Sequence, residues 1–327
     1  MTEIASIFQT IQLGVESTSG SSVAANKKLL SMGVEPGVSA EITTFRPAGM
    51  KYSTLTALNK EWTEAGLTGY PTYSEIIYPL SSVLCATSAS SLGGSPAAYS
   101  WIFNPSAVAA DTVKTFTIEQ GDATRAHKFT YGLVTGLTFN FSRDENGIEG
   151  TMIGQAMTDD ITMTATPTSI ELIPVLPTQV TVYLDDTYAG LGGTALTRPI
   201  SVSWQIGDRF NPLWALNASY TSFAAIVEAE PLLQVVMKME ADAAGMGLLA
   251  TMRTGATKFM RIEAVGETIS GGNKYKLTID TAVKVSDVAP FSDEDGVYAI
   301  EWTMVGVYDA AWGKVCEWKV INKQATL

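Results

Sequence analysis

The sequence is poor in the residue types on which metal binding and nucleophilic catalysis depend. It contains one histidine, His127, and two cysteines, Cys85 and Cys316. Two cysteines so far apart exclude a disulfide framework and a thiolate zinc site, and both are expected to be small buried residues. A serine or cysteine nucleophile needs a base within hydrogen-bond reach, and His127 lies in an alternating, strand-like segment. We therefore predict no catalytic residue, no metal site and no cofactor.

Basic residues and long apolar runs are also scarce. The chain carries 21 Lys and Arg against 33 Asp and Glu, which gives a net charge of −12. Binding to nucleic acid or to an anionic membrane requires concentrated Lys and Arg, so neither is an expected partner. No apolar run approaches the ~18 residues that span a bilayer, and the first residues lack the features of a signal peptide. We expect synthesis in a reducing cytoplasm, with any exit by a route other than secretion.

Strand and turn residues are abundant. The 28 Gly and 13 Pro, together with many Thr, Ser and Val, favour strands joined by turns, as in SEIIYPL at residues 74–80. Short helices are predicted over residues 55–65, where Leu55, Leu58 and Trp62 recur at helical spacing, and over residues 247–253. The sequence thus predicts a mainly β protein, and 327 residues suit about two domains.

The chain divides at a proline-rich segment. Residues 167–177 contain three prolines and are expected to be a linker between β-domains at 36–166 and 178–327. Residues 1–35 are rich in small polar side chains and predict an extended N-terminal arm. Five pairs of similar segments recur in the same order across the linker: Arg46-Pro47 and Arg198-Pro199, Pro79-Leu80 and Pro231-Leu232, KTFTIE and KFMRIE, HKFT and NKYK, FSRDENGI and FSDEDGV. This order predicts two tandem copies of one antiparallel β-sandwich or barrel, each with about one short helix.

The repeated acidic segment has two interpretations, a calcium loop or a hairpin turn. A calcium loop of the EF-hand type needs oxygen ligands over twelve positions and a closing glutamate, and neither copy provides them. Asn-Gly and Asp-Gly between alternating runs are instead typical of tight β-hairpins. The predicted hairpin tips are Asp144, Asn146, Gly147, Asp293, Asp295 and Gly296.

A second motif imitates a dinucleotide-binding fingerprint. Gly245 and Gly247 begin the segment GMGLLA, and Glu263 follows Gly245 by 18 residues. The preceding VVMKME alternates apolar and charged residues, whereas a strand buried on both faces is continuously apolar. A nucleotide-dependent enzyme is therefore kept only as an alternative.

Several long stretches resemble the major tail proteins, or tail tube proteins, of long non-contractile-tailed bacteriophages. The resemblance lies in GVESTSGSSVAANKKLLSM near the start, in residues 114–154 and in DGVYAIEWTMVGVYDAAWGKVCEWKVIN near the end. It covers most of the chain but has no signature motif. The resemblance implies packed antiparallel sheets with a flanking helix, and subunits whose long hairpins join edge to edge into stacked rings around a DNA channel.

The resemblance also implies partners and a location. A chain with two tube domains is expected to form a ring of three copies with pseudo-six-fold symmetry, and a chain with one tube domain a ring of six. Tape-measure and tail-tip or terminator proteins are the other expected partners, DNA passes through without specific binding, and the protein is expected in the virion tail. The alternative from another class is a phage decoration or adhesion β-sandwich.

Two groups of residues are candidates for this function. An acidic wall lets DNA slide, because a basic wall binds phosphates. The candidate lumen-facing acids are Glu149, Glu228, Glu230, Glu240 and Glu301. The candidate ring-stacking residues of the arm are Ser17, Ser19, Lys27 and Lys28.

Overall fold

Long antiparallel strands make up most of the computed structural model, which describes residues 6–122, 124–216 and 220–327. The mainly β fold predicted from the composition is confirmed. Up to residue 170 the elements are β1 (Thr10–Val15), β2 (Lys27–Leu29), β3 (Met32–Phe45), β4 (Leu55–Gly69), α1 (Ile77–Val83), β5 (Ser90–Gly93), β6 (Ala98–Phe103), β7 (Phe116–Gly121), β8 (Ala126–Ser142), β9 (Asn146–Gly154) and β10 (Thr168–Ser169). The remaining elements are β11 (Val180–Asp185), β12 (Pro199–Gly207), β13 (Phe210–Leu213), β14 (Ala225–Glu228), β15 (Leu232–Glu240), α2 (Ala243–Thr254), β16 (Lys258–Ser270), β17 (Asn273–Val288), β18 (Ser292–Glu294), β19 (Val297–Gly306) and β20 (Cys316–Asn322). Short 3-10 turns cover Ser6–Phe8, Pro177–Gln179 and Tyr188–Gly190.

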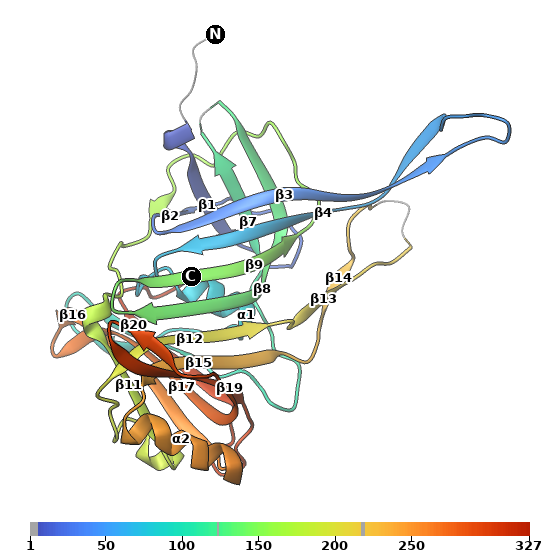
Figure 1. Ribbon diagram of the computed structural model, residues 1–327. Helices are drawn as coiled ribbons and strands as arrows, with labels where there is room; N and C mark the ends of the chain where they lie inside the picture. Colours follow the sequence, from blue (N-terminus) through green and yellow to red (C-terminus); the bar gives the residue numbers. More distant parts are fainter. Residues whose placement is uncertain (1–5, 123, 217–219) are drawn as a thin grey trace.

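One antiparallel sheet runs through the whole molecule. Its eight strands follow the order β3–β4–β9–β8–β12–β15–β19–β17, and it forms the front of the view in Figure 1. Behind it, β7, β1 and β2 continue from the first part of β8, and β16, β11, β20 and β6 continue from the first part of β17. The long strands β8 and β17 therefore belong to both layers.

The two parts of the chain use the same order of strand pairing. In the first, a β3–β4 hairpin is followed by α1, a β7–β8 hairpin and β9, which lies between β4 and β8. In the second, a β12–β15 hairpin is followed by α2, a β16–β17 hairpin and β19, which lies between β15 and β17. A register shift in each long strand lies opposite a threonine, with Thr151 facing Gly136 and Thr303 facing Asp287. We call these parts the first half and the second half.

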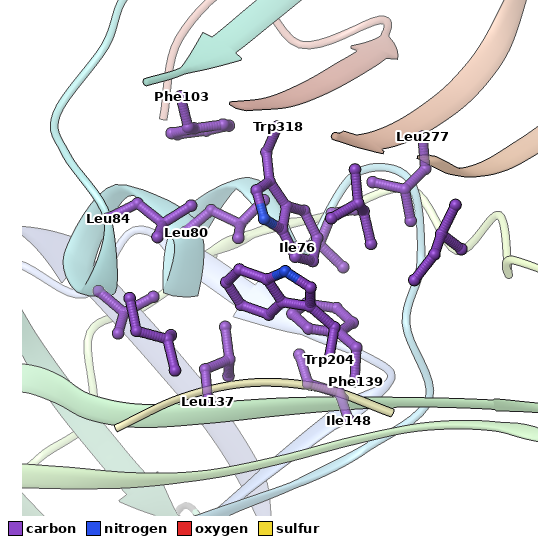
Figure 2. Close-up of a cluster of buried hydrophobic side chains, with 14 of the residues drawn as sticks. Ile76, Leu80, Leu84, Phe103, Leu137, Phe139, Ile148, Trp204, Leu277 and Trp318 are labelled. Atoms are coloured by element: carbon purple, nitrogen blue, oxygen red, sulfur yellow. The ribbon is translucent and has the colours of Figure 1, made fainter. Parts of the chain in front are cut away.

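The pairing of β8 with β12 joins the halves, and one core lies behind this junction. Figure 2 shows Trp204 and Trp318 of the second half beside Phe139 and helix α1 of the first. The Trp204 and Trp318 ring centroids are 4.8 Å apart, and those of Phe139 and Trp318 are 4.7 Å apart. The indole N–H of Trp204 donates to the Thr281 hydroxyl at 3.0 Å. Buried aromatic side chains of this size contribute strongly to stability, and here they come from both halves, which share this core.

One of the two predicted helices is confirmed and the other is wrong. Helix α2 contains residues 247–253, as predicted, but residues 55–65 lie in β4. This strand pairs with β3 along its whole length, and such tertiary pairing outweighs a weak helical preference.

The helix of the first half lies instead at residues 77–83 and overlaps the segment 74–80 that was predicted to be a strand. The Thr72 hydroxyl accepts the N–H of Glu75 at 3.1 Å in the turn that precedes α1. The buried Glu75 carboxylate in turn accepts the N–H of Leu30 at 2.6 Å and of Met32 at 3.2 Å. These bonds hold the turn from which α1 begins.

Most of the expected arm lies in the body of the protein. Strand β1 pairs with β7, and β2 pairs with β1, with Leu13 and Leu29 buried. The expected linker is also held in place, because β10 runs parallel to β2 and both Ile170 and Val175 are buried. Residues 1–5 of the arm lie outside the described residues. The apolar residues between the polar ones explain why these segments pack on the sheet.

Candidate assembly surface

The front sheet has one polar and one apolar face. In β8, Thr138 and Asn140 are partly exposed on the front, whereas Leu137, Phe139 and Phe141 are buried behind, as period-two alternation requires. The strand register aligns the polar positions of five strands in one row: Thr68, Glu149, Thr138, Gln205 and Gln234. The result is a continuous polar face across the junction of the two halves.

This polar face is hollowed where the two halves meet. The hollow is open to solvent and lies over β4, β9, β8 and β12. Its lining residues include Glu64, Glu149 and Asp208 and no Lys or Arg. Among the described residues that line the hollow, there are three acids and no cation.

The five predicted lumen acids occupy different environments. Glu149 is exposed on the polar face, and Glu301 lies on the same face opposite Lys238. Each is the second residue before the threonine that faces a register shift, so the two positions correspond. Glu240 also lies on this face but is paired with Arg198. Glu230 is exposed in the loop between β14 and β15.

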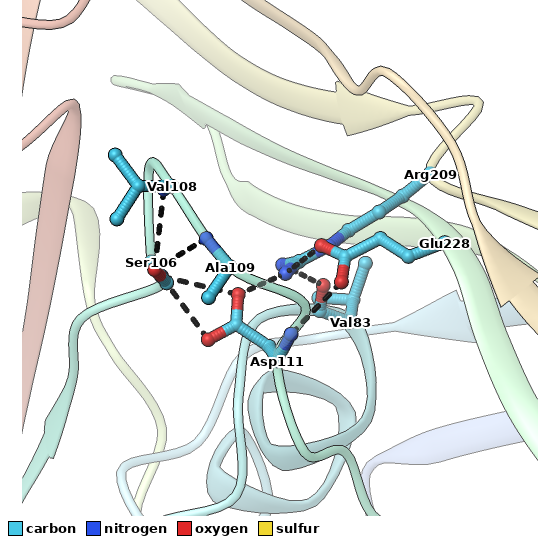
Figure 3. Close-up of polar contacts among 7 residues, drawn as sticks. All are labelled: Val83, Ser106, Val108, Ala109, Asp111, Arg209 and Glu228. Atoms are coloured by element: carbon cyan, nitrogen blue, oxygen red, sulfur yellow. Dashed lines mark hydrogen bonds and ion pairs between the residues drawn. The ribbon is translucent and has the colours of Figure 1, made fainter.

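Glu228, the fifth of these acids, lies away from the polar face. Its carboxylate pairs with the almost fully buried Arg209 at 2.7 Å and accepts the N–H of Asp111 at 2.9 Å. Arg209 also pairs with the Asp111 carboxylate and donates to the carbonyl of Val83, at the end of α1, at 2.7 Å (Figure 3). We call β3–β4 the first hairpin and β12–β15, with its outer part β13–β14, the second hairpin. These bonds hold the outer part of the second hairpin on the first half.

The loop between β13 and β14 makes further contacts with the first half, through aromatic rings and hydrogen bonds. The Phe223 and Tyr131 ring centroids are 5.2 Å apart, and Trp214 lies 5.4 Å from Trp62 of β4. The Ser222 hydroxyl accepts the N–H of Ala156 at 2.8 Å. The second hairpin thus lies across the first half, beside the base of the first hairpin.

Among the described residues, the outer part of the first hairpin has no such seat. This outer part, β3 and β4 beyond the sheet, projects away from the rest of the molecule in Figure 1. Ile42 pairs with Leu58 after a register shift, as Phe210 pairs with Glu228 after the break between β12 and β13. Val38 and Ile42 are 52% and 60% exposed, whereas Ile206 and Phe210, at the corresponding positions of the second hairpin, are 3% and 8% exposed. The apolar surface that is covered in one hairpin is uncovered in the other.

The sheet also ends in two open edges. Within residues 6–122, 124–216 and 220–327, strand β3 pairs with β4 only, and the last part of β17, residues 284–288, pairs with β19 only. The corresponding part of β8 pairs with β9 on one side and β12 on the other. Pro36 has no N–H to donate and occupies the middle of β3, a position that proline takes in edge strands. Unpaired edges of this length are sites of association.

The two acidic turns differ in geometry. Asp295 and Gly296, with φ of 52° and 83°, form the two-residue turn between β18 and β19, and the Asp293 carboxylate accepts the N–H of Gly296 at 3.2 Å. Asp144 is exposed in the turn between β8 and β9.

Asn146 and Gly147 were wrongly placed at the hairpin tip, because both belong to β9. Asn146 is buried and donates to the Val175 carbonyl at 2.8 Å. This hydrogen bond fixes Asn146 at the start of β9, so the two residues that were expected to form the turn belong to the strand instead.

The predicted ring-stacking residues lie on the body. Ser17 and Ser19 are exposed in the loop after β1, while Lys27 and Lys28 are paired in β2. The buried Glu16 carboxylate fixes this loop, since it accepts the N–H of Gly20 at 2.7 Å. The two lysines are therefore part of a sheet rather than of a projecting arm.

The described residues give little support to the alternatives of nucleotide binding, metal binding or nucleophilic catalysis. At the start of α2, where a nucleotide phosphate would bind, the Asp242 carboxylate accepts the N–H of Gly245 at 2.9 Å. In the part of the chain that the structure describes, no group of three His, Cys, Asp or Glu side chains is placed to hold a metal. His127 contacts the Gln120 amide at 3.0 Å. Burial raises the pKa of Cys85 to about 11 and of Cys316 to about 12, so neither thiol is poised as a nucleophile.

Two comparisons bear on the family of the chain. No protein-family model matches the sequence, and a search of curated proteins finds no match. Among the described helices, none has the length and apolar character required to cross a membrane.

Proposed function

We propose that the protein is the subunit of a bacteriophage tail tube, in which copies join edge to edge into rings that stack around a DNA channel. The observation that carries the proposal is the front sheet, which is polar toward solvent, apolar behind, and open at both edges. Pairing β3 of one copy with the free edge of β17 in the next repeats the existing β12–β8 junction. A closed ring leaves no open edge. The resemblance in sequence points to the same assembly.

We propose further that the halves are duplicated tube domains and that three chains close one ring. Both halves contribute four strands in the same order to the front sheet, so three chains present six equivalent units. The polar face then lines the channel, with Glu149 and Glu301 at corresponding positions. A wall with few free cations does not retain DNA, because phosphate binding depends on Lys and Arg. By the same resemblance, a tape-measure protein occupies the channel during assembly, and terminator and tip proteins cover its ends.

The test is the oligomeric state of the purified protein. Negative-stain microscopy is expected to show rings or open-ended tubes, and the mass of one ring is expected to equal three chains. A single chain that persists at high protein concentration would refute the proposal, and six chains per ring would refute the duplication.

A variant of the β3 edge sharpens this test. Pro36 has no N–H, and its nitrogen lies on the side of β3 that faces the open edge. Backbone N–H groups of alternate residues point to the same side of a strand, so the N–H of Val38 also faces the open edge. Val38→Pro is expected to abolish ring closure while leaving the β3–β4 ladder intact. Val38→Thr keeps the N–H and is the matched control, and rings of Val38→Pro equal to those of the control would contradict edge pairing.

A further inference from the structure

The seat of the second hairpin on the first half indicates where the first hairpin lies in an assembly. In that seat, Arg209 reaches the end of helix α1 through the Val83 carbonyl. It stands immediately before Phe210, the first residue paired after the break. In the first hairpin Glu41 stands immediately before Ile42, the first residue paired after the register shift. Glu41 of the first hairpin therefore corresponds to Arg209.

The two helices can be aligned by their C-terminal ends. Helix α1 ends at Val83, and helix α2 ends at Thr254. Arg253 stands in the last turn of α2 and is exposed. Where Arg209 meets the end of α1, Glu41 would thus meet a cation at the end of α2.

In the described residues of the second half, no long connection corresponds to the one that carries Asp111. Asp111 comes from the long connection between α1 and β7, whereas only residues 255–257 separate α2 from β16. The docking surface of the second half is therefore a helix end with an arginine and without the facing aspartate. Its charge complements Glu41, as the surface around Val83 and Asp111 complements Arg209.

We propose that the β3–β4 hairpin of one copy docks on the second half of the next copy, with Glu41 paired to Arg253 and with Val38 and Ile42 covered there. The occupant is a second copy because the same contact already exists inside the chain and covers Ile206 and Phe210. Glu41 now pairs with Lys60 of its own hairpin at 3.1 Å, an exposed pair. That surface pair is weakly held and leaves Glu41 available to Arg253. The proposal rests on the assembly proposed above and specifies its contact.

Reversal of the two charges tests this contact. Glu41→Arg and Arg253→Glu are each expected to raise the protein concentration for half-assembly by about tenfold, because like charges then face each other. The double variant Glu41→Arg/Arg253→Glu is expected to restore assembly. Glu41→Arg combined with Arg143→Glu, a reversal at an exposed turn, is the mismatched control and is expected to remain defective.

The outcomes separate this proposal from the assembly itself. Assembly by sedimentation and the unfolding midpoint are measured for each variant, so a folding defect is distinguished from a docking defect. If wild-type protein assembles and single reversals do not weaken it, or the mismatched double is restored equally, the docking contact is wrong while the tube stands. If wild-type protein never assembles, both proposals fail.

Discussion

Removal of the Arg209 guanidinium is expected to destabilise the folded chain strongly. In Arg209→Ala, Asp111 and Glu228 lose the cation between them, and the Val83 carbonyl loses its donor. Removing one partner of a buried ion pair costs about 3–5 kcal/mol. The Glu228 side chain is 22% exposed and can regain water, so we expect the low end, about 3 kcal/mol. The loss acts on the seat of the second hairpin, which joins the two halves.

Urea unfolding followed by tryptophan fluorescence measures this loss. Trp204 and Trp318 are fully buried beside the junction, so their emission reports unfolding. The titration is made at protein concentrations too low for assembly, and the free energy of unfolding is obtained by linear extrapolation. Arg198→Ala is the matched control, since Arg198 pairs with Glu240 at the surface, and its midpoint is expected to match wild type. An Arg209→Ala midpoint equal to that control would refute the assignment.

Three further predictions concern a turn, the thiols and the docking hairpin. Gly296→Ala is expected to lower the free energy of unfolding by about 1 kcal/mol, because φ of 83° is left-handed, whereas Gly147→Ala in β9 is expected to leave the urea midpoint near wild type. With the pKa of Cys85 raised to about 11 and that of Cys316 to about 12, folded protein at pH 8 should resist thiol alkylation that proceeds rapidly in urea; equal rates would contradict their burial. Ile42→Ser should raise the concentration for half-assembly about fivefold, from about 1 kcal/mol of lost burial per junction, and an equal effect of the exposed surface variant Leu172→Ser would remove the hairpin from the contact.

The sequence predicted correctly those features that depend on neighbouring residues, and it failed where contacts distant along the chain decide the structure. The Asp295-Gly296 turn was predictable because two residues with positive φ suffice to specify it. Asn146-Gly147 has the same composition, but a buried bond from Asn146 to Val175, 29 residues away, places it in a strand. The two turns differ because of a hydrogen bond to a carbonyl that is distant in the sequence, and the residues of the turn itself do not reveal that partner.

The candidate site was predictable only in part. Glu149 and Glu301 lie on the polar face because strand alternation fixes the face of each residue. Glu228 lies in an equally strand-like segment, yet the break after β12 turns it toward Arg209. The exposed apolar face of the first hairpin was missed because the spacing of Leu58 and Trp62 also suits a helix. Apolar residues at every second position from Met32 to Ile42, with Pro36 among them, would have indicated the strand.

By itself, the sequence determined the mainly β composition, the helix at α2, the acidic charge and the alternation that gives the front sheet its two faces. These properties depend on neighbouring residues and on period. Only the tertiary structure decided that residues 55–65 form a strand, that β1 and β2 join the body, and that β8 pairs with β12. Each of these depends on partners far along the chain, whose pairing outweighs local preference. The open edges of β3 and β17 are decided at the same level, because an edge is defined by the absence of a neighbouring strand.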